Sequence, residues 1–262
     1  MCKFLSLVSD GAGNIMYFNS EQRKKIIAKK MKDKNGNAIA YTDSHSSILA
    51  GHGIYGEEED MYNKYEYNPL TKEFEIDQLN NKNDSENVKK QCLELDFKTI
   101  VPELQIKEII NPISVQHGDT VNDTEIALLH MWDSVMASVR TSVWDSVRDS
   151  VMASVGTSVW ASVWDSVGTS VRASVWASVK DSVRASVGGS VMASVWDSVR
   201  AYISSFFVIR NWKYIAHEPN KNPFQPCIDL WNLGLVPSFN GRTCRLHKMC
   251  DSAKVIYEEV LD

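Results

Sequence analysis

The sequence predicts a mainly β fold, a narrow triangular β-solenoid of tetrapeptide repeats with about 12 residues per coil. A small α+β region at the N-terminus and a small C-terminal cap with a β-hairpin flank it. Three observations favour this class. One four-residue unit, x-x-Ser-Val, occurs seventeen times without a gap between Trp132 and Val199. Val is a strong strand former. A period of four also fits a regular helix poorly.

The period of four is the main argument against a helix. Four residues advance an α-helix by about 400°, so the Val stripe would drift by about 40° per unit and never form one buried face. Half of the residues would also be Ser or Val, which are mediocre helix formers. In a β-solenoid each unit instead forms one short side of a coil, and stacked coils pair at about 4.8 Å. Three units close a triangular coil, and the array then makes a rod of roughly 25–30 Å.

Each position of the unit has its own set of residues. The fourth is always Val, which we place in the core, and the third is always Ser, which we place at or beside the bend, where its hydroxyl can bond to backbone. The second is Asp, Ala, Thr or Gly, so space there is limited. The first is Trp, Arg, Met, Gly or Lys, which share neither size nor polarity, so it should point outward. Duplication of a short DNA repeat is an alternative source of this regularity.

A coil of about 12 residues predicts which outward side chains stack, because residues i and i+12 then share a face. We expect Trp132 over Trp144, Trp164 over Trp176, Trp160 over Arg172, and Arg184 over Trp196. These residues form the predicted binding surface, since exposed aromatic and Arg side chains are typical of interfaces. A square coil would stack i on i+16 instead, and a helix would bring i+3 and i+4 together.

The repeat and two segments outside it together resemble a known family. The opening Met1–Phe4 through Val8–Gly11 and the segment Asn63–Leu70 accompany the x-x-Ser-Val array. Together they resemble the tetrapeptide-repeat β-solenoids of phage and bacterial proteins, which are related in style to pentapeptide-repeat proteins. The resemblance implies a fold and a phage or bacterial origin, and no established activity.

The N-terminal region, residues 1–119, reads as α+β. We expect a strand at 3–9 paired with 15–18, a helix from about 20 to 32, a loop at 42–61, and paired strands at 65–67 and 74–76. A polar linker at 78–86, a short helix at 87–96 and an extended stretch at 97–110 follow. Residues 120–131 are predicted to form a capping helix that covers the first coil of a solenoid at 132–203.

The C-terminal segment, residues 204–262, is predicted to be a cap domain. A short helix at 227–233 would end at Gly234. Asn240-Gly241 suits a tight hairpin turn between strands at 235–239 and 242–246, and residues 255–259 could add a third strand.

Composition restricts the partners and the compartment. The chain holds 28 basic and 33 acidic side chains, and the repeat region 132–200 holds six of each. Binding to nucleic acid is therefore not expected. No run is long and apolar enough to span a bilayer, so we expect no membrane. Five cysteines form no disulfide framework, which indicates the reducing cytoplasm of a bacterium or of an infected host. No cofactor motif occurs.

The sequence contains few residues in patterns typical of catalysis or metal binding, and we predict no catalytic or metal site. If Met1 were removed, Cys2 could act as an N-terminal nucleophile with help from Asp43, His45 or His52, although a plain strand cysteine is the simpler reading. A second group could offer zinc ligands, but its spacing is not that of a known zinc motif. It consists of Cys227, Cys244, His247 and Cys250.

Three functional classes follow from these observations. The favoured one is a structural or interaction protein that presents Trp and Arg side chains to a protein partner, and the same surface could join copies of the chain. An enzyme with its site in the N-terminal region, with Cys2 and His45 as candidates, is the alternative. A DNA mimic of the pentapeptide-repeat kind would need an acidic rod, and this repeat has no net charge.

Overall fold

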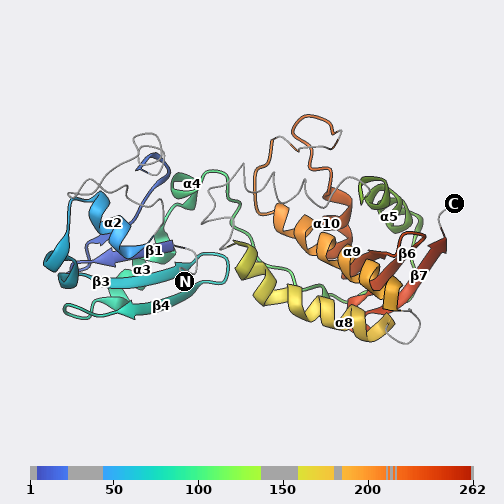
Figure 1. The fold of residues 1–262 in the computed structure, drawn as a ribbon, viewed down its shortest axis with the longest axis horizontal. Coiled ribbons are helices and arrows are strands. Elements are labelled where there is room, and N and C mark those ends of the chain that lie inside the picture. Colours follow the sequence, from blue (N-terminus) through green and yellow to red (C-terminus); the bar gives the residue numbers. More distant parts are fainter. Residues whose placement is uncertain are drawn as a thin grey trace. The chain divides into compact units, whose positions relative to one another are not determined.

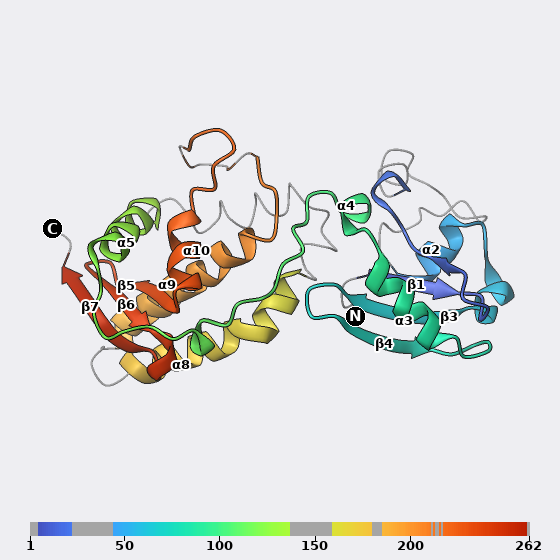
Figure 2. The ribbon, with the colours of Figure 1, turned by 180° about the vertical axis from the view of Figure 1, so that it is seen from behind.

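The computed structural model of the chain describes residues 5–22, 44–136, 159–179, 185–210, 212, 215 and 217–260. It divides into two compact units, residues 1–107 with 153–159, and residues 108–152 with 160–262. Each unit combines helices with one small antiparallel sheet (Figures 1 and 2). The fold is therefore mixed α+β, and the prediction of a mainly β solenoid is wrong. Among the residues that the structure describes, the repeat forms helices.

The sheet of the first unit has the strand order β2-β1-β3-β4. Tyr65 pairs with Ile76 and Tyr67 pairs with Phe74, which confirms the predicted pairing of these segments. The strand at the N-terminus pairs with its predicted partner through Val8 and Met16. The strands are β1 (Leu5–Ser9), β2 (Ile15–Met16), β3 (Asn63–Asn68) and β4 (Glu73–Gln78).

The first unit also contains helices, one of which packs against the sheet. One cluster of buried side chains joins Val8 of β1 to Ile48 and Leu49 of α2, with Phe18 beside them. The predicted loop at 42–61 is thus partly wrong, because the Ser44 side chain accepts from the Ser47 N–H and starts a helix there. The predicted helix at 87–96 is present, and the stretch from 97 begins with a helical turn rather than extended chain. The helices are α2 (His45–Gly51), η1 (Gly56–Met61), α3 (Ser85–Glu94) and α4 (Phe97–Ile100).

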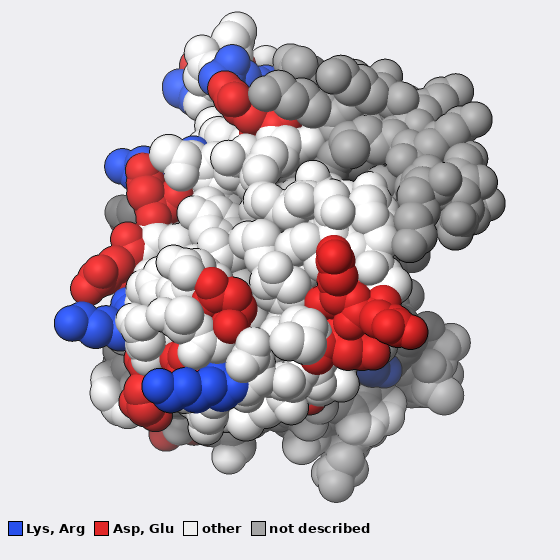
Figure 3. Space-filling view, turned by 90° about the vertical axis from the view of Figure 1, so that its left-hand side faces the viewer, with Lys and Arg blue, Asp and Glu red and all other residues white. Residues whose placement is uncertain are grey.

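Asp84 connects the loops at one end of the sheet. Its carboxylate accepts from the Tyr65 hydroxyl at 2.6 Å, from the Asn63 amide at 3.0 Å and from the Gly13 N–H at 2.9 Å, and also from the Ser9 hydroxyl. These hydrogen bonds to the charged form lower the pKa of Asp84 against its desolvation by burial. The surface of the first unit also carries acidic side chains, among them the four acidic residues of η1. Figure 3 shows several acidic groups on one face of the molecule.

The second unit holds the sheet β5-β6-β7 and the helices formed by the repeat. Val236 pairs with His247 and Leu246 pairs with Tyr257, so the predicted hairpin and third strand are confirmed. Gly234, at φ +78°, follows the predicted helix α10. The elements are η2 (Pro112–Ser114), α5 (Asp123–Met136), η3 (Trp164–Gly168), α8 (Thr169–Val179), α9 (Ala185–Ser204), α10 (Gln225–Asn232), β5 (Leu235–Phe239), β6 (Thr243–Lys248), η4 (Met249–Asp251) and β7 (Lys254–Val260).

Most Val side chains in the described part of the repeat lie in the core, as expected, but they do so from helices, and Val135 is half-buried. Between residues 159 and 199, every Val whose side chain the structure describes is at most 2% exposed. The predicted capping helix at 120–131 is α5, which continues into the first repeat unit.

None of the described helices is long and apolar enough to cross a membrane. The predicted compartment stays a prediction.

A π-helical turn reduces the drift of the Val stripe. In the turn Trp164–Gly168 the Thr169 N–H bonds to the Trp164 carbonyl, five residues back. A π turn takes one residue more than an α turn, so it sets the helical phase back by about 100°. From Val159 to Val175 an ideal α-helix would drift by about 160°, and the π turn leaves about 60°. The stripe therefore stays on one side, whereas a regular α-helix of the same length would carry it nearly to the opposite side.

The Ser residues of the repeat bond to their own helix. The hydroxyl of Ser194 donates to the Val191 carbonyl at 2.8 Å, and that of Ser198 lies 3.0 Å from the Ser194 carbonyl. Such bonds satisfy a hydroxyl that would otherwise be buried without a partner. Ser194 and Ser198 are 2% and 0% exposed. Each unit can thus place a polar side chain inside a helical core.

These two Ser residues also reach the outer edge of β5. The Phe239 N–H donates to the Ser194 hydroxyl at 2.8 Å, and the Ser198 hydroxyl lies 3.1 Å from the Pro237 carbonyl. Since β6 occupies the other side of β5, these backbone groups would lack a partner without α9. The helix therefore satisfies a sheet edge that would otherwise be open.

The substitution Ser194→Ala should destabilise the protein by about 1 kcal/mol or more, because it leaves the partly buried Phe239 N–H without its acceptor. The free energy of unfolding is measured by urea titration followed by circular dichroism. Ser170→Ala is the matched control, since Ser170 is exposed and its hydroxyl bonds to the Val167 carbonyl of its own helix. Equal losses in the two variants would contradict the role of Ser194 at the strand edge.

His247 of β6 is buried between two partners. Its Nδ1 lies 3.1 Å from the Ala253 carbonyl, which can only accept, so Nδ1 carries the proton. Its Nε2 then accepts from the Ser238 hydroxyl at 2.7 Å. Burial lowers the pKa of His247 to about 4, so the neutral ring is the folded form.

This pKa predicts a loss of stability in mild acid. Between pH about 6.5 and 4 the unfolded chain binds a proton at this residue and the folded chain does not, so the free energy of unfolding falls as the pH falls. The loss from this group should reach about 3 kcal/mol at pH 4. Urea titrations across this range test it against His247→Gln, which should show a shallower pH dependence. Identical pH profiles would contradict the assignment.

Candidate functional site

Three first-position tryptophans of the repeat stack on one another in the second unit. The ring centroids of Trp164 and Trp196 lie 4.2 Å apart with an interplanar angle of 21°. Trp160 lies 6.0 Å from Trp164 and 5.8 Å from Trp196, again nearly parallel. Stacked aromatic pairs contribute about 0.5–1.5 kcal/mol beyond the area they bury. The three rings join the segment before α8 to α9.

Two arginines complete this tryptophan–arginine cluster, which we define as Trp160, Trp164, Trp196, Arg172 and Arg200. The Arg200 guanidinium lies 5.8 Å from the Trp160 centroid and 5.5 Å from that of Trp196. The Arg172 guanidinium lies 5.8 Å from the Trp196 centroid. Cations over aromatic faces are attracted by the ring quadrupole.

The two arginines differ in their other partners. Arg200 Nη1 lies 3.2 Å from the carboxylate of Asp197, which is 1% exposed. For Arg172 the described part of the chain supplies no carboxylate within ion-pair distance. Arg200 is therefore a structural cation, and Arg172 retains donors for a ligand.

Gly168 makes room for the cluster. A Cβ added at Gly168 would lie 2.3 Å from the nearest atom of the Trp164 ring, far inside van der Waals contact. The ring thus packs directly over the backbone at the end of the π turn. This accounts for the Gly at this first position.

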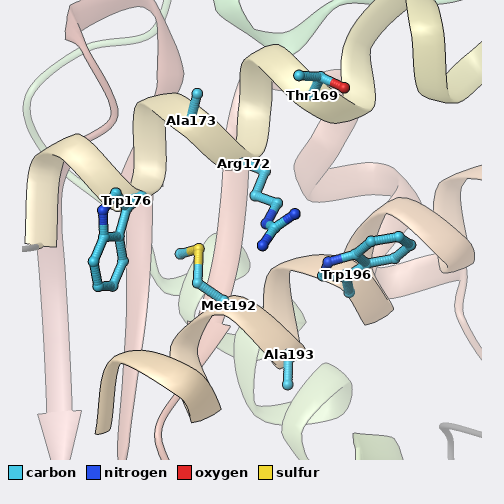
Figure 4. A pocket seen from close by; sticks show the side chains of 7 residues that line it. All are labelled: Thr169, Arg172, Ala173, Trp176, Met192, Ala193 and Trp196. Atoms are coloured by element: carbon cyan, nitrogen blue, oxygen red, sulfur yellow. The ribbon is translucent and has the colours of Figure 1, made fainter. Parts of the chain in front are cut away.

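An open groove lies beside the cluster, between α8 and α9. It has a volume of about 690 Å³. Figure 4 shows Arg172 and Trp176 projecting from α8 toward the groove and Met192 and Trp196 lying on the α9 side. Trp176 is 43% exposed. The lining is completed by Thr169, Ala173 and Ala193.

The α8 side of the groove follows helical spacing. Thr169, Arg172, Ala173 and Trp176 stand at i, i+3, i+4 and i+7, which share one helix face. All the lining residues occupy first or second positions of their units. The groove therefore offers an indole, a thioether and small side chains, with one guanidinium. This chemistry suits a large apolar side chain that stands next to a carboxylate.

The predicted stacking partners are wrong. Trp160 contacts Trp164 at i+4, which is a helical spacing, and both contact Trp196. Arg172 lies over Trp196 rather than Trp160, and Trp176 lines the groove. Trp132 is 1% exposed and packs edge-on against Phe224 at 6.3 Å, so it belongs to the core. Trp144 and Arg184 lie outside the described residues.

Of the candidate catalytic residues, Cys2 and Asp43 also lie outside the described residues. His45 sits at the start of α2, where its Nε2 is 2.9 Å from the Tyr65 carbonyl and 3.8 Å from the Glu66 carboxylate, and its Nδ1 is 3.5 Å from Asp77. The exposed His52 stacks on Phe18. The enzyme hypothesis stays a prediction, since its nucleophile is not described.

The candidate zinc ligands have other partners. Cys244 and His247 lie three residues apart in β6, so their side chains point to opposite faces of the sheet. Burial raises the pKa of the Cys227 and Cys244 thiols to about 12. Cys250 is half-buried. Among the described residues, no group of three or more His, Cys, Asp or Glu could hold a metal ion.

Comparison of the chain with protein-family models, with curated proteins and with solved structures gave no match. The family resemblance suggested by the repeat is therefore not supported, and the helical repeat contradicts it as well. The sequence pattern indicated Arg172, Trp176 and Trp196 as exposed binding residues, but it indicated neither Met192 nor the role of Gly168. Counting first and second positions at helical spacing would have found Thr169, Ala173 and the α9 side of the groove.

The substitution Gly168→Ala tests the packing of Trp164. Replacing Gly by Ala in a helix normally stabilises by about 1 kcal/mol, but here the added methyl overlaps the ring, so we expect a loss of about 1–3 kcal/mol. Near-ultraviolet circular dichroism should also lose part of the tryptophan signal. Gly118→Ala is the control, because an added Cβ there meets no atom within 4 Å. A more stable Gly168→Ala variant would contradict the described packing.

Proposed function

We propose that the second unit is a protein-binding module, and that the groove between α8 and α9 binds an amphipathic helical segment of a partner protein. The observation that carries this proposal is the shared face of α8, where the exposed Trp176 and Arg172, which has no ion-pair partner among the described residues, line one groove. A partner helix would place a large apolar side chain against Trp176 and Met192. A carboxylate beside that side chain would pair with Arg172.

The residue types support a protein ligand. Trp, Arg and Met are enriched at the centres of protein interfaces, and most binding energy comes from a few such residues. Two neighbouring helices with an apolar groove between them are a usual site for a third helix. The guanidinium of Arg172 offers a planar fork of donors that matches a carboxylate.

Other ligand classes find less support. A single-stranded nucleic acid would need several cations along the groove, and among the described residues that line it only Arg172 is a cation. The repeat region has no net charge, so mimicry of DNA is not supported either. His45, with its two neighbouring carboxylates, lies in the first unit and contributes nothing to this groove.

The experiment is a selection from a displayed library of helical peptides against the whole chain, with Trp176→Ala protein as competitor. Selected peptides should carry a large apolar residue beside Asp or Glu. Trp176→Ala and Arg172→Ala should each weaken their binding by about tenfold or more, since interface Trp and Arg typically contribute over 1.4 kcal/mol. Calorimetry measures the dissociation constants.

The matched control is Leu233→Ala, which removes an exposed apolar side chain of the same unit outside the groove. Binding should be unchanged in this variant. Selected peptides that bind equally well to the wild-type chain and to both groove variants would contradict the proposal, as would a selection that enriches no sequence.

A further inference from the structure

The helix that forms one side of the groove extends beyond α8. Residues 159–163 are α-helical, the π turn Trp164–Gly168 follows, and α8 continues the helix to Val179. A π turn is wider than an α turn, so residues four apart stay closer to one line along it. Asp165 therefore lies on the same face as Thr169, the second position of the next unit. The face that lines the groove thus reaches back by at least one unit.

This face carries one negative and one positive side chain. Asp165 and Arg172 are both exposed and stand seven residues apart, which is about two helical turns. Figure 4 shows Arg172 projecting toward the groove. The other exposed residues of the face are Thr169, Ala173 and Trp176. Among the described residues, the α9 side of the lining is uncharged and consists of Met192, Ala193 and Trp196.

A helix with this charge pattern is complementary to an antiparallel copy of itself. If Asp165 of one copy lies opposite Arg172 of the other, twofold symmetry places Arg172 of the first copy opposite Asp165 of the second. One pair of residues then supplies two ion pairs to the dimer. A parallel arrangement would set each charge against its like, which is unfavourable. The charges therefore favour an antiparallel pair in this register.

The same register also matches side chains by size. Trp176 of each copy lies opposite Ala161 of the other, because both pairs of positions are symmetric about the same axis. The half-buried Trp164 lies opposite Ala173 in the same way. A large ring against a small side chain lets two helices approach to the 8–10 Å that is typical of packed helices.

We propose that the groove binds residues 159–179 of a second copy of this chain, and that the protein forms a symmetric dimer by antiparallel pairing of these helices. The inference rests on the proposed function, because it names the partner helix for that groove. The segment supplies the chemistry that suits the groove, since Trp164 stands directly before the exposed Asp165. Paired over residues 161–176, the two helices share roughly 22 Å.

Sedimentation equilibrium of the full chain measures the association. At up to about 100 µM the wild type should form dimers and no larger species, because a twofold interface is closed. Asp165→Arg and Arg172→Asp should each weaken the dimer by about tenfold or more, since each replaces two ion pairs with two like-charge contacts. A wild-type chain that stays monomeric, or that grows beyond a dimer, would overturn the inference.

Restoring the ion pairs is the sharper test. The double variant Asp165→Arg/Arg172→Asp forms both pairs in reverse, so its dissociation constant should return to within about threefold of the wild type. An equimolar mixture of the two single variants should also associate, because each copy then meets opposite charge at both contacts. The matched control is Glu218→Arg, which makes the same change of charge at an exposed residue of the same unit outside this helix, and it should leave the dimer unchanged. Failure of either restoration refutes the register.

Crosslinking tests where the symmetry axis lies. In this register the axis passes beside Thr169, so a short bismaleimide should join two copies of Thr169→Cys. Ser170→Cys is the matched control, because Ser170 is also exposed but points about 100° away around the helix. The wild type accounts for the native cysteines. Equal crosslinking of the two variants would contradict the inference.

Peptides selected from the helical library separate this inference from the proposed function. A peptide whose binding depends on Trp176 and Arg172 should dissociate the dimer, because the peptide and the second copy would occupy one groove. A dimer that persists with the peptide bound would have its interface elsewhere, which overturns this inference alone. A monomeric chain that still selects such peptides would also overturn it and leave the proposed function standing.

Discussion

The burial of one Val in every four residues is the constraint on which the second unit depends. A regular helix cannot keep such a stripe on one side, because its turn is shorter than the repeat. The structure meets the constraint in two ways. The π turn Trp164–Gly168 delays the drift before α8. Helix α9 tolerates the drift because it packs against α8, α10 and β5, so that Val191, Val195 and Val199 all stay buried.

Near-identical units create a problem of register, which a few contacts made by particular side chains solve. Sliding a helix by one unit would keep Val in the core and Ser bonded to its own backbone. It would, however, separate Trp164 from Trp196, whose stacked rings lie 4.2 Å apart in two different helices. The hydroxyl of Tyr202, which accepts from the Ile110 N–H at 2.7 Å, would also lose its partner. A few unique contacts thus select one register among many similar ones.

The sequence predicted the flanking sheets better than the repeat. Alternating residues and the Asn240-Gly241 turn identified the strand pairs, because these signals are local. The prediction of a solenoid for the repeat was wrong because Val and Ser disfavour helices only weakly, and packing outweighs such preferences. A π turn has no evident signal in a uniform repeat. The sequence indicated that Trp176 and Arg172 are exposed. It did not indicate which residues lie next to them, because those neighbours follow from helical spacing and a solenoid was expected.

The mismatch between a four-residue unit and a helical turn also restricts how the coding array can change in length. Each unit gained or lost by recombination between DNA repeats would rotate every later side chain by about 40°. Only about nine units, or roughly 36 residues, complete whole α-helical turns and restore the phase. Most length variants would therefore turn the groove residues of α8 away from α9. Such an array should keep its number of units nearly fixed.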